Sequence, residues 1–344
     1  MSKIIYLPLE HIESRYTFHM DRDILKYLDE SGKEYIRVYP DIPSPQTMKA
    51  GSFLDAEFTI RFKAAQIAEV ARLYREDIID SGDIVWSSDL WHPGLPESIA
   101  YMNYFAKKDV KLRGLIHAGS WTDTDFVRDM ERWAKNFEDT LFDIADEIYC
   151  GSDFIKNDIV KKRIIHPDKL IPTGFPLDTE NLDKVKKVEK ENIVIFSGRN
   201  VDEKQPWLFE QMRDKLGDNN IKFINTLEHN YSKEEYYNLL AKSKVVVSFA
   251  LQENFGYSVA EAVYLGCIPI LPNRLVYPEF YSGEYLYDTF DEACKMVENV
   301  IYSDSKPISA TRDYQEAIQR WFRWLKLTLF ISLHSQQVKW VLTL

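Results

Sequence analysis

The chain has 344 residues, of which 45% are hydrophobic, enough to fill the cores of two domains of ordinary size. That apolar content excludes wholesale disorder. The formal net charge of -11 at pH 7 argues against a general attraction to nucleic acid or anionic membrane, although a local basic groove stays compatible with it.

The cysteines and the N-terminal residues indicate the compartment. Cys150, Cys267 and Cys294 are far apart and show no CxxC spacing, so free thiols in a reducing compartment are expected. The first residues turn acidic too early for a secretory signal. No apolar run reaches the roughly eighteen residues that a spanning helix needs. We therefore expect a cytoplasmic protein without a membrane span.

The first half of the chain alternates short β-rich runs with longer helical stretches. The strands are expected at 4–8, 35–40, 83–88, 112–117 and 146–152, and the helices at about 19–31, 61–80, 95–107, 126–144 and 152–162. This alternation predicts parallel strands with helices on both faces of the sheet.

A second series of the same kind follows a linker-like stretch, 172–192, which holds two prolines, a glycine and a charge run. Its strands are expected at 192–198, 221–226, 244–250, 268–272 and 284–288, and its helices at about 204–216, 233–243, 258–266 and 289–302. The predicted fold class is α/β, with two doubly wound Rossmann-like domains facing a cleft.

The expected domain bounds follow from these two series. Residues 1–175 form the N-terminal domain and residues 176–310 the C-terminal domain. Within the remaining segment, 311–344, residues 313–326 are predicted to form an aromatic amphipathic helix that returns to the N-terminal domain. Residues 327–344 have no clear period and are not placed.

The strongest chemical motif is QENFGYSVAEAVYLGCIPILP, which lies between two predicted strands. Glu253 ends the first strand, where ligands bind in open α/β sheets. Asn254, Phe255 and Gly256 open the following helix with free backbone N–H groups, a suitable place for a diphosphate or a sugar hydroxyl. Glu261 lies eight residues after Glu253 on that helix. By spacing alone, Glu253 could equally be an ordinary acidic residue at a helix start, and Glu261 could equally be a surface residue.

A second motif, SGRNVDEKQP, follows the strand predicted at 192–198. Arg199 and Lys204 leave that strand together, and two cations there could neutralise a departing diphosphate. The alternative is a solvated loop. A cation near a helix start, such as Lys204, interacts unfavourably with the helix dipole. Its presence there therefore favours a functional role.

Taken in order, these pieces resemble the retaining glycosyltransferases of the GT-B fold, family 4 type. The matching residues are Gly198-Arg199, Lys204, Glu253-Asn254-Phe255-Gly256, Glu261-Ala262 and Gly266-Cys267-Ile268-Pro269. The resemblance is specific over 190–272 and diffuse over 1–190. The chain is also similar to glycosyltransferase-like proteins of tailed bacteriophages.

The resemblance implies a donor that is a nucleotide-diphosphate sugar, UDP- or GDP-linked, without a required metal. Arg199 and Lys204 would hold the diphosphate, and Glu261 would accept hydrogen bonds from the ribose. Glu253 would hold hydroxyls of the transferred sugar, and the amides of residues 254–256 would face the sugar and phosphate. Transfer with retention would need no protein nucleophile.

Two stretches of the N-terminal half bear on the same site. His117 ends a predicted strand and is expected to touch the donor sugar, as a histidine does at this place in the family. The alternative is a satisfied core histidine. The family often has a glycine pair after the first strand, whereas the loop at 8–18 has no glycine, so Glu10, Arg15 or Tyr16 is expected to fill that space.

The triplet Asp123-Thr124-Asp125 matches the DxD pattern of metal-dependent glycosyltransferases. It directly precedes a predicted helix, where acidic and hydroxyl residues act as ordinary caps, and we favour capping. The other classes considered are a nucleotide-sugar epimerase of similar architecture and a non-catalytic sugar-nucleotide-binding relative.

The acceptor side of the sequence matches no motif. The phage resemblance implies either a hydroxymethylated pyrimidine in DNA or a glycan as the acceptor, and a host cytoplasm as the compartment if the protein is phage-encoded. The oligomeric state is not predicted.

Overall fold

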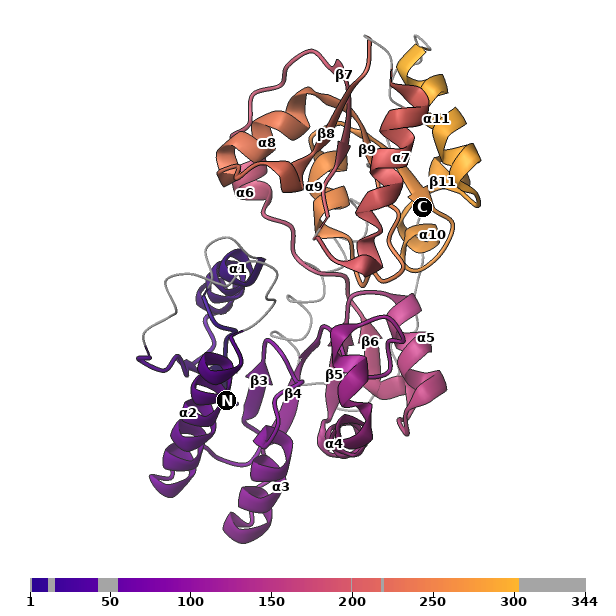
Figure 1. Ribbon diagram of the computed structural model, residues 1–344. Helices are drawn as coiled ribbons and strands as arrows, with labels where there is room; N and C mark the ends of the chain where they lie inside the picture. Colours follow the sequence, from indigo (N-terminus) through magenta and orange to yellow (C-terminus); the bar gives the residue numbers. More distant parts are fainter. Residues whose placement is uncertain (1, 12–15, 43–54, 199, 218–219, 303–344) are drawn as a thin grey trace, which may run out of the picture.

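The structure is a computed structural model, which describes residues 2–11, 16–42, 55–198, 200–217 and 220–302. These residues form two lobes, each built on a parallel sheet (Figure 1). No helix among them is long and apolar enough to cross a membrane. The return helix predicted at 313–326 and the unplaced tail lie outside the described residues.

The N-terminal lobe contains a six-stranded sheet in which every described pair is parallel. Its strands are β1 (Ile4–Leu7), β2 (Tyr35–Arg37), β3 (Ile84–Ser87), β4 (Lys111–Ile116), β5 (Glu147–Cys150) and β6 (Leu170–Pro172). Their order across the sheet is β2-β1-β3-β4-β5-β6. The order reverses between β1 and β3, and ligands bind at such a switch point in open sheets.

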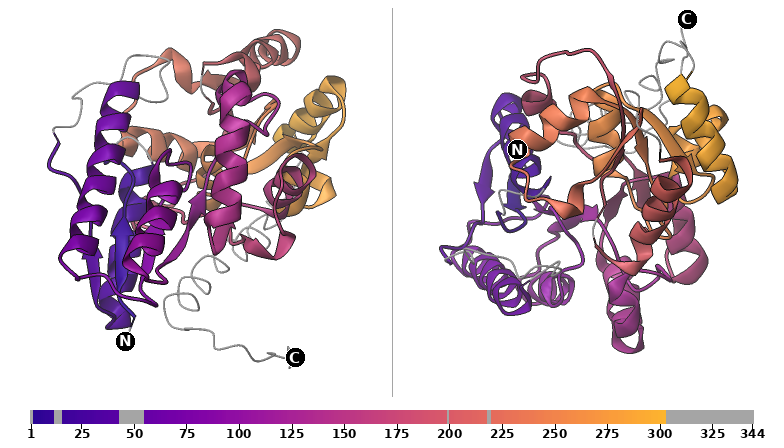
Figure 2. Two further views of the ribbon diagram at one scale, coloured as in Figure 1. Left: turned by 90° about the horizontal axis from the view of Figure 1, so that it is seen from below. Right: turned by 45° about the horizontal axis from the view of Figure 1, so that its top comes forward.

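Right-handed crossovers decide which face each helix covers. The helices are α1 (Tyr16–Ser31), α2 (Ala56–Arg75), α3 (Leu95–Ala106), α4 (Glu131–Ile144) and α5 (Asp153–Lys162). The connection through α1 runs toward the β2 edge, and the others run toward β6, so α1 lies on one face and α2 to α5 on the other. The two faces accordingly have separate hydrophobic clusters, one with residues of α1 and the other with residues of α2 to α5. Helices α2 and α3 lie side by side on the outer face (Figure 2).

The C-terminal lobe repeats the plan with five strands in the order β11-β10-β9-β7-β8. The strands are β7 (Glu191–Phe196), β8 (Lys222–Asn225), β9 (Ser243–Val247), β10 (Ile268–Pro272) and β11 (Leu286–Tyr287). The helices are α6 (Thr179–Leu182), α7 (Pro206–Leu216), α8 (Lys233–Lys242), α9 (Tyr257–Tyr264), α10 (Tyr277–Phe280) and α11 (Phe290–Tyr302). Apolar residues of α8 and α9 cover one face, and those of α7 and α11 cover the other.

Most predicted elements are confirmed, and the differences have local causes. Helix α2 begins earlier than predicted because Asp55 caps it, accepting from the Phe58 amide at 3.0 Å. It also ends earlier, near Asp77, whose φ of 53° is left-handed. The helix predicted at 126–144 starts as a 3-10 turn, η1 (Phe126–Met130), before α4. The short β6 and α6 were not predicted, because three or four residues carry too little periodicity.

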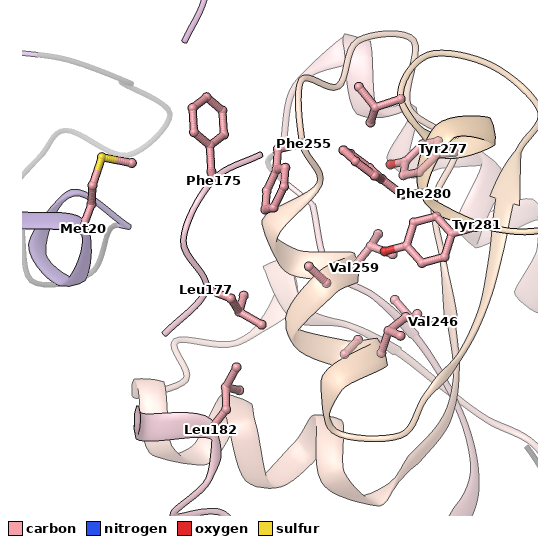
Figure 3. Close-up of a cluster of buried hydrophobic side chains, with 14 of the residues drawn as sticks. Met20, Phe175, Leu177, Leu182, Val246, Phe255, Val259, Tyr277, Phe280 and Tyr281 are labelled. Carbon is pink, nitrogen blue, oxygen red and sulfur yellow. The ribbon is translucent and has the colours of Figure 1, made fainter. Parts of the chain in front are cut away.

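The two lobes share one hydrophobic cluster around the chain that connects them. Figure 3 shows Phe175 and Leu177 of this connection between Met20 of α1 on one side and Phe255, which precedes α9, and Val259 of α9 on the other. All five side chains are buried. Because apolar surface from both lobes is removed from water here, the cluster stabilises one arrangement of the lobes.

His19 of α1 also lies at this junction. It is 3% exposed, and its Nε2 lies 3.2 Å from the carbonyl oxygen of Pro176. Since a carbonyl only accepts, Nε2 carries the proton of a neutral ring. Burial lowers the pKa of His19 to about 4.

This burial predicts a loss of stability in mild acid. The unfolded chain binds a proton at His19 near pH 6.5, whereas the folded state binds it only near pH 4, so stability falls as the pH falls through this window. The advantage of the wild type over His19→Gln should therefore shrink by up to about 3 kcal/mol from neutral pH to pH 4. Denaturant unfolding of both proteins at several pH values measures this difference in the free energy of unfolding. His166→Gln, whose ring is 71% exposed, is the control, and parallel pH curves for wild type and His19→Gln would contradict the prediction.

Candidate active site at the junction of the lobes

Two loops of the C-terminal lobe meet where β7 and β9 end. The first contains η3 (Asp202–Lys204), and the second leads from β9 into α9. The Leu251 amide donates to the Glu203 carbonyl at 2.7 Å, which holds the loops together. Lys204 Nζ donates to the Gln252 carbonyl and lies 3.2 Å from Glu253 Oε2. Lys204 is buried, so its charge faces the second loop and not solvent.

Glu253 is bound on its other oxygen by the start of α9. Oε1 accepts from the amides of Asn254 at 3.1 Å, Phe255 at 3.4 Å and Gly256 at 2.9 Å. Burial alone would raise the pKa of Glu253, but the charge and hydrogen bond of Lys204 and these amides outweigh it, so the pKa lies below its ordinary value. Glu253 is therefore ionised at neutral pH.

Gly256 allows the tight turn that brings these amides together. Its φ is 80°, a left-handed conformation that costs glycine little and other residues more. A Cβ at this position would lie 3.6 Å from the Cγ of Glu253, which is ordinary contact. Conformation, and not space, is thus the reason for glycine here.

Glu261 lies further along α9 and is 8% exposed. Its Oε1 accepts from the Tyr237 hydroxyl at 2.9 Å and lies 3.5 Å from Lys233 Nζ. Burial raises the pKa of Glu261, and Lys233 and the Tyr237 hydroxyl only partly oppose it. The two glutamates of the motif therefore differ in character: Glu253 is held firmly ionised, and Glu261 takes up a proton more readily.

His117 of the N-terminal lobe follows β4. Its Nε2 lies 2.7 Å from the Ser88 carbonyl, so Nε2 carries a proton, and its Nδ1 is 3.5 Å from the Tyr16 hydroxyl. The ring stacks on Phe175 at 4.8 Å between centroids. Burial lowers the pKa of His117, so the ring is neutral at pH 7. The histidine is held in one tautomer and one orientation.

Asn254 links His117 to the loop before α9 across the lobes. Its Nδ2 donates to the His117 carbonyl at 2.6 Å, and its Oδ1 accepts from Gln252 Nε2 at 3.0 Å. Phe255 is buried against Phe175, with ring centroids 5.5 Å apart. The sequence predicts that the amides of residues 254–256 face the donor, but in the structure they donate to Glu253.

Of the three DxD residues, Asp125 acts as the capping interpretation predicts, and the other two make different contacts. Asp125 accepts from the Val127 amide at 3.1 Å and caps η1, and Asp123 lies 3.1 Å from Lys162 Nζ. Thr124 Oγ1 donates to the Leu251 carbonyl of the other lobe at 3.1 Å. No group of three or more His, Cys, Asp or Glu residues suited to a metal occurs in the described part of the chain. Arg199 lies outside the described residues, so the structure does not place its side chain.

Several contacts of the site have no signal in the sequence. Tyr16 stacks on Tyr257 at 4.9 Å between centroids and 14° between planes, joining the two lobes. Lys233 and Tyr237, the partners of Glu261, come from α8 and its first turn, 24 residues or more before it. The absence of glycine from the loop after β1 was the one feature of the sequence that pointed to Tyr16 as a residue of the site.

Comparison with known proteins gives partial matches to glycosyltransferases. No family model matches the chain. It is 39% identical over 94 residues to the tRNA-queuosine alpha-mannosyltransferase of Drosophila melanogaster, which is 27% of this chain and 24% of that protein. It is 24% identical over 160 residues to a protein of Acidianus filamentous virus 1 that carries the name glycosyltransferase, 45% of each chain. The chain thus matches less than half the length of these relatives.

Solved structures match almost the whole chain. The sucrose-phosphate synthase of Thermosynechococcus elongatus has a TM-score of 0.64 at 13% identity, covering 94% of this chain and 96% of that one. The Anabaena protein HepE, in complex with UDP and glucose, has a TM-score of 0.58 at 13% identity, covering 93% and 96%. The fold is therefore GT-B, with two parallel-sheet α/β domains, as predicted.

The Lys204–Glu253 pair should show strong coupling in stability. Lys204→Met leaves the partly buried Glu253 carboxylate without its cation and should cost about 2 kcal/mol, whereas Lys204→Met/Glu253→Gln should cost clearly less than the sum of the single changes. Chemical denaturation of the four proteins measures the coupling. Lys215→Met, which breaks an exposed pair with Asp291, is the control and should cost less than about 1 kcal/mol. Additive single and double variants would show that the pair is not coupled.

Proposed function

We propose that this protein is a glycosyltransferase that moves a sugar from a nucleotide-diphosphate sugar to an acceptor hydroxyl, with retention of the anomeric configuration. The observation that carries the proposal is the Lys204–Glu253 pair at the start of α9. It places a cation and an oriented carboxylate at the carboxyl ends of β7 and β9, where ligands bind in such sheets. The names of the partial relatives support the same activity.

Each donor group has a candidate partner. Lys204, with Arg199 from the same loop, would bind the diphosphate and neutralise the charge that develops on it as the bond breaks. Glu261 would accept hydrogen bonds from the ribose hydroxyls. Glu253, ionised and fixed by the amides of residues 254–256, would accept from hydroxyls of the transferred sugar. Neutral His117 would contact the same sugar from the N-terminal lobe.

The anomeric configuration is retained if the acceptor attacks the anomeric carbon on the same face from which the leaving group departs. The bond from the anomeric carbon to the phosphate oxygen breaks, the bond to the acceptor oxygen forms, and the acceptor's proton passes to the departing phosphate. No protein nucleophile or metal is required. The α-linked product named for the Drosophila relative agrees with this course for a donor that is itself α-linked.

For the acceptor we propose a hydroxyl group on a modified nucleoside of a nucleic acid. The Drosophila relative is named for a modified nucleoside of tRNA, and the second relative is viral. The name of the Drosophila relative agrees better with a nucleic-acid acceptor, which includes a hydroxymethylated pyrimidine of phage DNA, than with a glycan. A phage origin would place the enzyme in the host cytoplasm.

One nucleotide should stabilise the protein more than the others. A ligand that binds only the folded state raises the melting temperature, by an amount equivalent to about 2.7 kcal/mol at a hundredfold excess over Kd. Thermal unfolding with UDP, GDP, ADP and CMP, alone and as sugar conjugates, should give a clear shift with one diphosphate. Lys204→Ala should reduce that shift. The absence of any shift would contradict a donor site.

The two glutamates should separate in kinetics. Glu253→Gln should lower kcat with donor KM little changed, because its contacts matter most as charge develops on the sugar. Glu261→Gln should raise the donor KM, because the ribose is bound equally in ground and transition states. The rates of donor hydrolysis and of transfer to modified RNA give kcat and donor KM for each variant. EDTA should change neither rate. Equal, small effects of both substitutions would overturn these roles.

A further inference from the structure

A pair of tryptophans lies on the N-terminal lobe outside the donor residues. Trp133, in the first turn of α4, is 47% exposed, and its ring centroid is 5.8 Å from that of the half-buried Trp91. Trp91 in turn meets the buried Phe137 edge to face at 5.5 Å. The Trp133 indole is thus half exposed and packs on Trp91, which is itself supported by Phe137. A large apolar ring held open to water in this way is suited to stacking on a ring of a ligand.

Trp91 is held in place by a buried carboxylate that the sequence did not single out. Glu138 of α4 is fully buried and accepts from Trp91 Nε1 at 3.1 Å and from the Ser120 amide at 2.6 Å. Arg163 Nε neutralises it at 2.7 Å. This network joins the loops that follow β3 and β4 to α4 and the end of α5. Trp91 therefore has a fixed orientation, as a recognition surface requires.

The network also connects Trp91 to the loop that carries His117. Ser120, bound by Glu138, is three residues after His117, and Trp91 is three residues after Ser88, whose carbonyl binds the His117 ring. Lys63 Nζ further ties this loop, donating to the Trp91 carbonyl at 2.6 Å and to Asp89 at 3.0 Å. Trp91 thus belongs to the loop after β3 that orients the His117 ring, and Trp133 packs against it from the first turn of α4.

We propose that Trp133, backed by Trp91, stacks on a base of the nucleic-acid acceptor and so presents its nucleoside hydroxyl to the sugar. This inference rests on the proposed function. Arg132, exposed in the same first turn of α4, would bind the adjoining phosphate. A cation at a helix N-terminus is unfavourable for the helix dipole, so its place there is not explained by helix stability. Stacking also suits a protein of net charge -11, because it does not depend on a broad basic surface.

The test measures binding of a fluorescein-labelled RNA hairpin, and a DNA hairpin of the same sequence, by fluorescence anisotropy. Trp133→Ala should weaken binding of at least one hairpin about tenfold, the effect expected for one lost base stack, and Trp133→Phe should recover part of it. Arg132→Ala should weaken binding and reduce its salt dependence. Tyr104→Ala is the matched control, since this 78% exposed aromatic residue of α3 lies outside the two loops, and it should bind as the wild type does.

The stabilisation by nucleotide diphosphate is measured on the same proteins. If it is normal and Trp133→Ala binds both hairpins as well as Tyr104→Ala does, the stacking inference is wrong and the donor proposal stands. If the wild type binds neither hairpin but binds maltoheptaose in a Trp133-dependent way, the acceptor is a glycan and the inference is again wrong. If no nucleotide stabilises the wild type, the donor proposal itself fails.

Discussion

The contacts of the Glu253 carboxylate hold together the loops on which the candidate site depends. A carboxylate largely removed from water is unfavourable unless its charge is balanced and its lone pairs are satisfied, and here Lys204 and the amides of residues 254–256 do both. Satisfying this one group therefore fixes the loop after β7 relative to the loop after β9. It also fixes the turn at Gly256 and, one residue on from the carboxylate, the side chain of Asn254.

Asn254 extends this local order to the other lobe. Its amide donates to the His117 carbonyl, while Glu279 of α10 accepts from the first amides of α5 at 3.0 and 3.1 Å. A carboxylate at a helix N-terminus is favoured by both the free amides and the helix dipole. The lobes thus meet through polar contacts of defined direction on either side of the aromatic cluster around Phe175. Such contacts bring His117 to the donor motif in one orientation only.

Much of this fold could be predicted because its signals are local. Alternating β-rich and helical runs, with each loop rich in polar residues, predict two parallel sheets, and residues at strand ends necessarily gather at one edge of each sheet. The sequence placed Glu253, Lys204 and His117 at strand ends in this way, and the structure has them there. Strand β6 escaped prediction because three residues carry no period. Glu138 escaped because an acidic residue in an amphipathic helix gives no sign of being buried.

By itself the sequence determined the order of the elements, the two-lobed GT-B plan and the identity of the polar groups at the strand ends. Tertiary structure alone decided what those groups do to one another. The amides of residues 254–256, free in any isolated helix start, are taken up by Glu253 because the turn at Gly256 folds them onto it. The pKa values of Glu253 and Glu261 move in opposite directions because their neighbours come from other segments. Burial and charge pairing depend on residues distant in the chain, and no local pattern records them.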